Sequence, residues 1–198
     1  MSGRQGIVVG ITGASGAAIG VRVVERLADN PHYAVHLVVS PAAERTLNEE
    51  VGVGALARLR AIAFRCHPHS DVGASIASGS YPIAGMIVAP CSIRTLSAIA
   101  WGQLDDLLTR TADVQLKERR RLVLLVRESP LHLGHLRAML QATEIGAIIA
   151  PPMPAFYLRP QSLDEVIDQV AARAINLLDL TNLRTPAKVW SGSSPNGA

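Results

Sequence analysis

Apolar residues follow two alternating patterns along this chain. In short stretches such as 7–11 and 84–89, nearly every residue is apolar or glycine, which predicts strands buried on both faces of a parallel sheet. Between them, apolar residues recur every three or four positions, the spacing of an amphipathic helix. This alternation predicts a single α/β domain with a mostly parallel sheet between two helical layers, a three-layer Rossmann-like (flavodoxin-like) fold. The expected strands are 7–11, 34–39, 84–89, 122–126 and 147–150, and the expected helices are 16–28, 42–50, 92–100, 131–143 and 163–180.

Other regions have weaker patterns. The stretch 51–81 is irregular, and within it 56–63 fits either a short strand or a short helix. Asp105–Arg110 is expected to be a connection. We expect residues 1–185 to form the domain and residues 186–198, which are mostly small and polar, to be a mobile tail.

The first predicted strand ends in a glycine-rich turn, Gly13-Ala14-Ser15-Gly16, and a helix follows. Such a turn presents backbone N–H groups and the positive end of a helix dipole to an anion. Ser15 could cap the helix, donate to a phosphate, or do both. The glycine spacing does not fit a dinucleotide fingerprint, and the chain has no Gly-Lys pair for a P-loop. The turn indicates a mononucleotide phosphate site, with a purely structural turn as the close alternative.

Hydroxyls, glycines and one charged pair follow the successive predicted strands. Because ligands of open parallel sheets bind beyond the carboxyl ends of the strands, these residues are expected around one ligand. Each hydroxyl alone is better explained as a helix cap, but their recurrence favours a phosphorylated ligand. Arg127-Glu128 is either a structural ion pair or a phosphate clamp beside an acid–base group. The strand ends are Thr12–Ser15, Ser40, Pro90–Thr95, Arg127-Glu128 and Pro151–Tyr157.

Composition indicates how the protein associates, which kind of ligand it suits and where it is located. Apolar residues make up 48% of the chain and charged residues only 18%, which indicates apolar surface buried between subunits. The net charge of +3 suits an anionic small molecule and does not require nucleic acid, so the charge run 117–121 is better explained as a solvated helix end. No signal peptide or membrane-spanning run is recognisable, so we expect a cytoplasmic protein without a membrane span.

Cysteines and histidines do not indicate metal chemistry. Two cysteines, Cys66 and Cys91, make no disulfide framework, and Cys91 fits a buried inert thiol better than a nucleophile. His67-Pro68-His69 and the pair His132 and His135 lack further ligands at metal-type spacing. We therefore expect no metal site.

Five blocks of sequence, in order, resemble the UbiX-like flavin prenyltransferases, also known as the small-subunit family of aromatic acid decarboxylases. The resemblance covers about residues 6–180. The blocks are Gly13–Gly16 (GASG), Ala89–Leu96 (APCSIRTL), Arg110–Arg120 (RTADVQLKERR), Val126–Leu131 (VRESPL) and Pro151–Tyr157 (PPMPAFY).

This resemblance implies a metal-independent prenyltransferase. Such an enzyme joins the dimethylallyl group of dimethylallyl monophosphate to N5 and C6 of reduced FMN, and residues 1–185 would be its flavin-binding domain. The prenylated FMN would be handed to a UbiD-like decarboxylase. The family is commonly a dodecamer, so the chain would form a homo-oligomer with sites shared between subunits.

The resemblance also implies three overlapping sets of site residues. Ser15, Glu50 and Glu128 would be catalytic, with Ser15 and Glu50 assisting proton transfers at the flavin. FMN would be held by Gly13, Ala14, Ser15, Ser40, Ser92, Ile93, Arg94, Thr95 and Arg127, and the prenyl phosphate by Arg110, Lys117, Glu128, Tyr157 and Arg173.

The chain departs from the family pattern at several positions. Val72 stands where one form of the family has Trp, Trp101 where His is frequent, Asp106 where Asn is often found, and Pro41 where Lys is common. These departures bear on substrate selection and leave the expected phosphate residues intact. Trp190 is matched loosely to a C-terminal Trp that folds over the site.

Two alternative functions stay open. One is an FMN-dependent decarboxylase of the related group that acts on cysteine-derived substrates; the first predicted helix has no His, and Ala89–Ile93 does not match that group's segment. The other is a non-enzymatic FMN-binding accessory subunit of an aromatic acid decarboxylase. A flavin carrier would need no second phosphate clamp of the kind formed by Lys117, Glu128, Tyr157 and Arg173.

Overall fold

A computed structural model describes residues 3–183 and 187–188 of the chain. Within these residues the strands form a six-stranded sheet in the order β3-β2-β1-β4-β5-β6, and every neighbouring pair is parallel. The strands are β1 (Gln5–Ile11), β2 (Tyr33–Val39), β3 (Arg65–His67), β4 (Ile83–Cys91), β5 (Arg121–Val126) and β6 (Ile148–Ile149). The helices are α1 (Ala17–Ala28), α2 (Pro41–Glu50), α3 (Ala55–Ile62), α4 (Ile93–Ala100), α5 (Leu107–Lys117), α6 (Leu133–Glu144) and α7 (Leu163–Asn176), with 3-10 turns η1 (Ser75–Ala77) and η2 (Phe156–Leu158).

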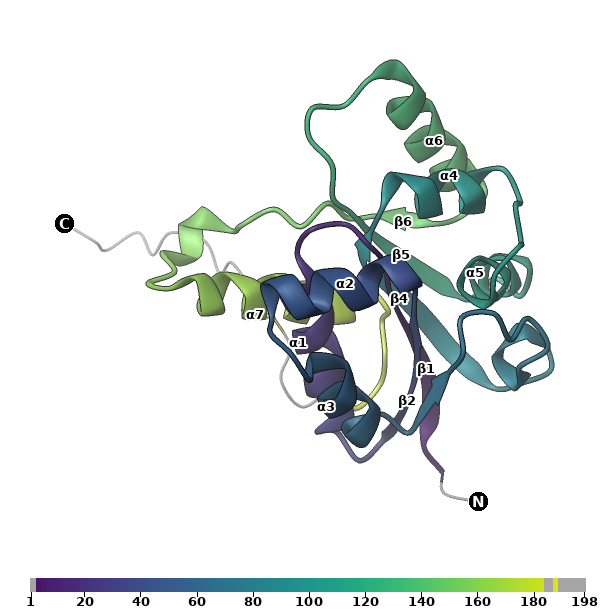
Figure 1. Ribbon diagram of the computed structural model, residues 1–198, viewed down its shortest axis with the longest axis horizontal. Helices are drawn as coiled ribbons and strands as arrows, with labels where there is room; N and C mark the ends of the chain where they lie inside the picture. The colour runs from purple at the N-terminus through teal and green to yellow at the C-terminus, as the bar shows by residue number, and fades with distance from the viewer. Residues whose placement is uncertain (1–2, 184–186, 189–198) are drawn as a thin grey trace.

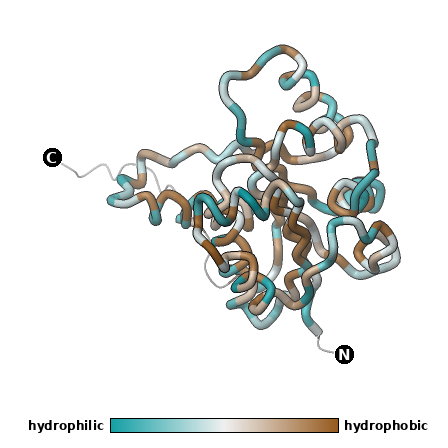
Figure 2. The backbone as a smooth tube through the Cα atoms, in the orientation of Figure 1, coloured by the Kyte–Doolittle hydropathy of each residue, from teal (hydrophilic) through white to brown (hydrophobic). Residues whose placement is uncertain are grey.

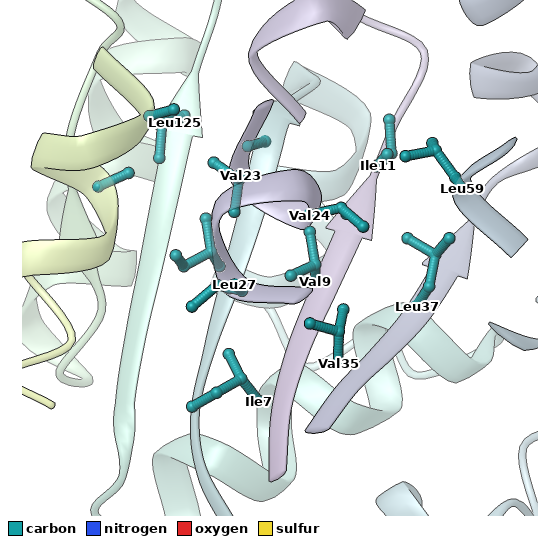
Figure 3. Packing of buried hydrophobic residues seen from close by; sticks show 14 of the residues in the cluster. Ile7, Val9, Ile11, Val23, Val24, Leu27, Val35, Leu37, Leu59 and Leu125 are labelled. Atoms are coloured by element: carbon teal, nitrogen blue, oxygen red, sulfur yellow. The ribbon is translucent and has the colours of Figure 1, made fainter. Parts of the chain in front are cut away.

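The helices cover both faces of the sheet, which confirms the three-layer fold (Figure 1). Alternate residues of β1 divide between the two layers. Ile7, Val9 and Ile11 pack under α1 together with α2, α3 and α7 (Figure 3), whereas Val8 packs with α4, α5 and α6. Because both faces are covered, the central strands are apolar without alternation, as the brown tube at the centre of Figure 2 shows.

Helix α5 was not expected, because Asp105–Arg110 was interpreted as a connection. That prediction is wrong: Asp106 caps a helix whose first residue is Leu107. The inward face of α5 includes the buried polar residues Thr109, Thr111 and Gln115, which interrupt the apolar spacing that marks a helix.

Other differences are smaller. The stretch 56–63 is helical, as α3, which was one of the two alternatives. The edge strand β3 was not expected because it is only three residues long. Ser162 caps α7 as expected, but the helix ends at Asn176 instead of residue 180, and Asp179 has a φ of 55°, which a continuing helix cannot accommodate.

The predicted tail 186–198 lies outside the described residues except for 187 and 188, and Trp190 lies outside them as well. In the described part of the chain, no helix is both long and apolar enough to cross a membrane.

Candidate active site

The carboxyl ends of the four central strands are tied together by hydrogen bonds. The Thr12 hydroxyl donates to the carbonyl of Pro90 (2.7 Å) and accepts from the backbone N–H of Ser92 (2.8 Å), which joins β1 to β4. The N–H of Ser40 donates to the last residue of β1, and that of Arg127 to the last residue of β4. The residues expected to hold FMN therefore lie together at the carboxyl ends of the strands, called the carboxyl edge of the sheet below, as the strand ends predicted.

The N-terminus of α1 is occupied by a carboxylate of the chain itself. Oε2 of Glu50 accepts the backbone N–H groups of Gly16 and Ala17, each at 2.8 Å. Gly16 is the N-cap with a φ of 105°, a conformation that favours glycine. Ser15 does not cap α1; its hydroxyl is hydrogen-bonded to Glu50. The glycine-rich turn was expected to be a mononucleotide phosphate site, with a purely structural turn as the close alternative. The structure favours the structural turn, because Glu50 accepts both N–H groups.

The pKa of Glu50 lies below its ordinary value. Burial by itself raises the pKa of this carboxyl, but hydrogen bonds from the Ser15 hydroxyl and from the two α1 N–H groups outweigh burial. The positive charge of Arg127 lowers the pKa further. Ser15, Glu50 and Arg127 therefore form one electrostatically coupled group at the carboxyl edge.

Two of the predicted hydroxyls cap helices that begin at this edge. The Ser40 hydroxyl accepts from the N–H of Ala43 (3.2 Å) at the start of α2, and the Ser92 hydroxyl accepts from the N–H of Thr95 (3.3 Å) at the start of α4. The positive dipole ends of both helices consequently face the site. The cap interpretation is confirmed for these two hydroxyls, and both helix starts point at the carboxyl edge, where the phosphate is expected.

The other residues expected to hold FMN differ in how closely they pack against neighbouring elements. A Cβ at Gly13 would lie 2.5 Å from the Cβ of Ala42, so the turn approaches α2 too closely for any residue with a side chain. Ala14 is half-buried, and the partly buried Ile93 packs on the core beneath α4. Arg94 is exposed and pairs with Asp106.

Tyr157 and Arg173, two of the residues expected to hold the prenyl phosphate, line one cavity. It has a volume of about 240 Å3 and lies between the ends of β5 and β6, the loop 150–158 and α7. Its wall also includes Met153, Gln169 and Lys188. Lys188 was not predicted to line this cavity. It follows α7 in the sequence, and the chain folds back so that its N–H contacts Gln169 on the same helix, which no sequence motif indicates.

The other expected phosphate residues lie apart from this cavity in the single chain. Arg110 is half-buried in the first turn of α5, and Glu128 is exposed after β5, where its carboxylate accepts the N–H of Ser129 (3.0 Å). Lys117 is the last residue of α5 and contacts Glu118. Its ammonium group lies next to Gly79, which precedes β4, so Lys117 is near the amino ends of the strands. Helix α5 itself lies on the face of the sheet opposite α7 (Figure 1).

The departures from the family pattern are distributed around the site. Pro41 is the first residue of α2, a position that tolerates proline. Val72 and Trp101 are exposed on the same side of the sheet as α5, whereas Asp106 is buried.

Burial raises the pKa of the Cys91 thiol far above its ordinary value, consistent with an inert thiol. Among the described residues, no three His, Cys, Asp or Glu side chains gather as a metal site.

Comparison with known proteins identifies the family. The family model named Flavoprotein matches residues 1–173. The flavin prenyltransferase UbiX of Salmonella typhimurium is 55% identical over 187 residues, which cover 94% of this chain and 98% of that protein.

Two solved structures are similar to this chain in both fold and sequence. AnUbiX (PadA1) in complex with FMN and dimethylallyl pyrophosphate has a TM-score of 0.89 at 46% identity and covers 96% of this chain and 100% of its own. A dodecameric FMN-dependent UbiX-like decarboxylase from Escherichia coli O157:H7 has a TM-score of 0.89 at 40% identity, with the same coverage of 96% and 100%. These similarities favour prenyl transfer over the two alternatives. The chain belongs to the flavoprotein family and, within it, to the UbiX flavin prenyltransferases.

Proposed function

We propose that this chain transfers the dimethylallyl group of dimethylallyl monophosphate to N5 and C6 of reduced FMN, without a metal ion. The observation that carries the proposal is the cavity in which Tyr157 and Arg173 meet, between α7 and the ends of β5 and β6, beside the strand ends assigned to FMN. A protein that only carried FMN would need no second cation-bearing pocket. The relative that holds FMN and dimethylallyl pyrophosphate supports the same two kinds of ligand.

The carboxyl edge of the sheet fits FMN. The starts of α2 and α4 offer positive dipole ends, and Arg94 and Arg127 add cationic groups. Gly13 lets the backbone turn at a point where a side chain would collide with Ala42. Bound reduced FMN supplies the two nucleophilic ring atoms. We assign FMN to Gly13, Ala14, Ser15, Ser40, Ser92, Ile93, Arg94, Thr95 and Arg127.

The prenyl phosphate needs positive charge as its C–O bond breaks and the phosphate leaves with the bonding electrons. Arg110, Lys117 and Arg173 supply this charge, and Tyr157 supplies a hydroxyl donor. Glu128 acts as the acid that protonates the departing phosphate. Because these donors neutralise the developing charge, no metal ion is required in this step.

Each new bond releases one proton, from N5 and from C6. The alkene carbon of the transferred dimethylallyl group takes up one proton so that the group can bond to C6, and the other proton leaves with the phosphate. Ser15 and Glu50 lie at the carboxyl edge and would relay these protons. Glu50 is held by the two α1 N–H groups and by the Ser15 hydroxyl, so its position is fixed before substrates bind. Its lowered pKa keeps the carboxylate ionised and able to polarise that hydroxyl. We assign proton transfer at the flavin to this pair.

Residues from more than one chain complete the site. Lys117 lies close to the amino ends of the strands, where Arg120 donates to the carbonyls of Gly79 (2.6 Å) and Tyr81 (3.1 Å) just before β4. Arg173 lies in the α7 layer on the opposite face. Because the two residues lie on opposite faces of the sheet, we infer that Lys117 serves the site of a neighbouring subunit.

The exposed face of α6 supports a homo-oligomer, which we propose to be a dodecamer. Leu133, Leu136 and Leu140 are spaced three and four residues apart and are 58%, 49% and 59% exposed. Such a stripe is unusual on the surface of a monomer and suits contact with another copy. The dodecameric UbiX-like relative supports this assembly.

We place the reaction in the cytoplasm and its product with a UbiD-like decarboxylase. Reduced FMN persists in a reducing compartment, and Cys66 and Cys91 are both free thiols. The flavin product is useful only to a second enzyme that carries out chemistry on it. The decarboxylase named by the family resemblance fits that role.

The direct test is an anaerobic reaction of the full chain with reduced FMN and the prenyl phosphate in the presence of a chelator. We expect prenylated flavin, seen by mass spectrometry of the released cofactor, together with free phosphate. Parallel reactions with the monophosphate and the pyrophosphate identify the preferred donor. A strict Mg²⁺ requirement, or CO2 released from an aromatic acid with no change in flavin mass, would overturn the proposal.

Variants of the phosphate residues separate binding from transfer. Lys117→Ala and Arg173→Ala should each slow phosphate release by roughly 100-fold, or about 3 kcal/mol, while FMN binding stays near that of the parent chain. Glu128→Gln should retain both ligands and stall turnover. Arg121→Ala is the matched control, because Arg121 is an exposed arginine paired with Asp179. An equal loss in Arg121→Ala would show that the effect is not specific to the site.

A further inference from the structure

The carboxylate of Asp106 makes more contacts than its role as a helix cap requires. Its side chain is 8% exposed, and Oδ1 accepts the N–H of Thr109 (2.8 Å) at the start of α5. Oδ1 also lies 3.6 Å from Nε2 of His69, and Oδ2 accepts from Nη1 of Arg94 (3.2 Å). The two oxygens therefore join α5, α4 and the loop after β3.

The cap alone does not explain an acid at this position. An asparagine would offer Thr109 the same acceptor oxygen without a buried charge. Burial raises the pKa of Asp106, but the hydrogen bonds from Thr109 and Arg94 and the nearby His69 outweigh it and hold the pKa below its ordinary value. The negative charge is thus maintained, and the oxygen not needed by the cap faces Arg94.

Arg94 needs such a partner. It lies in the first turn of α4, where the positive end of the helix dipole disfavours a cation. Its side chain is 70% exposed, and among the described residues Asp106 is its one hydrogen-bonding partner. Without a negative partner, the guanidinium would sample many orientations in solvent and move away from the helix start.

We propose that Asp106 is a positioning residue for flavin binding, which holds the guanidinium of Arg94 at the carboxyl edge so that it can pair with the phosphate of FMN. This inference rests on the proposed function, since that places FMN at this edge. The backbone reinforces the arrangement, because the N–H of Leu107 donates to the carbonyl of His69 (2.9 Å) and fixes the loop beside Asp106. Asp106 acts through Arg94 and does not itself contact FMN.

A double-mutant cycle on FMN binding tests the inference. We measure the Kd of FMN from the quenching of its fluorescence for the parent chain, Asp106→Asn, Arg94→Gln and the double variant, with thermal unfolding as a second readout. Each single variant should weaken FMN about three- to tenfold, and Asp106→Asn should add nothing in the Arg94→Gln background. Asp179→Asn, which removes the charge of another acid paired with arginine, is the control and should leave the Kd unchanged.

The outcomes distinguish the inference from the function on which it rests. An undiminished effect of Asp106→Asn in the Arg94→Gln background would overturn the inference, as would a lower Tm with an unchanged Kd, which would indicate that the charge of Asp106 serves stability only. If the parent chain bound no FMN, the proposed function itself would be wrong. If the parent bound FMN and Asp106→Asn bound it equally well, the positioning role alone would be wrong.

Discussion

At the scale of single residues, the carboxylate of Glu50 has both a structural role and an expected catalytic role. It closes the N-terminus of α1 from a position 34 residues further along the chain, and it is also the expected proton acceptor beside Ser15. A phosphate bound at α1 would have to displace this carboxylate. We therefore propose that the FMN phosphate binds at the starts of α2 and α4, where the serine caps leave the positive dipole ends facing the carboxyl edge.

We predict that Glu50→Gln destabilises the fold by about 1 kcal/mol near neutral pH, because a neutral amide interacts more weakly with the helix N-terminus. A carboxyl whose pKa is lowered by folding stabilises the native state above its unfolded pKa and loses that contribution as pH falls through the folded pKa. The ordinary pKa is 4.5 and the folded pKa lies below it, so the difference between parent and variant should shrink below that pH.

Urea unfolding at about pH 7 and at several acidic pH values measures this difference. Glu49→Gln is the neighbouring control, because Glu49 makes an exposed pair with Arg45 and should change stability by less than about 0.5 kcal/mol. A pH-independent difference between the parent chain and Glu50→Gln would contradict the assigned role of the charge.

Residue identities at the strand ends were predictable, but several of their partners were not. The position of Ser40 or Arg127 follows from where a strand stops, which the local pattern predicts. The pairing of Glu50 with Gly16 depends on how α2 folds back over the first turn, and no local pattern encodes it. Lys188 was missed for the same reason.

At the scale of elements, α1 packs against β4 through Gly20. A Cβ on Gly20 would lie 2.2 Å from the carbonyl oxygen of Ala89, so only glycine permits this contact. The close approach brings the start of α1 next to the end of β4, where the Ser92 segment begins.

We predict that Gly20→Ala destabilises the protein by roughly 1–3 kcal/mol, although alanine is normally the better helix former. Gly73→Ala is the control, because a Cβ at Gly73 would meet only a carboxylate oxygen of Asp71 at 3.8 Å, an ordinary contact. Thermal unfolding of both variants checks the contrast. Equal stability of Gly20→Ala and the parent would show that α1 can move away from β4 at no cost.

The elements that were predicted correctly have largely apolar inner faces. Strands β1, β2 and β5 are nearly continuous apolar runs, and α1 has a clear amphipathic spacing. Helix α5 escaped prediction because its buried face carries polar side chains such as Thr111 and Gln115. A polar residue in the core breaks the periodicity on which such predictions depend.

At the scale of the whole molecule, Lys117 on α5 and Arg173 on α7 lie in different helical layers, and we propose that each chain contributes these two residues to different phosphate sites. We predict that Lys117→Ala and Arg173→Ala chains, each nearly inactive alone, regain activity when co-expressed. With random mixing, about a quarter of the sites would receive an intact Lys117 from one chain and an intact Arg173 from another. Phosphate release by the purified mixture measures the recovery, and no recovery would show that both residues act within one chain.

The two outer strands of the sheet limit how the subunits can associate. β3 has three residues and β6 has two, so each sheet edge offers only a few backbone groups for a further strand. Pairing of edge strands between copies of the chain is therefore disfavoured, and we expect the copies to meet through helices and loops. The same short edges give a protein this rich in apolar residues little template for fibrous, strand-to-strand aggregation at high concentration.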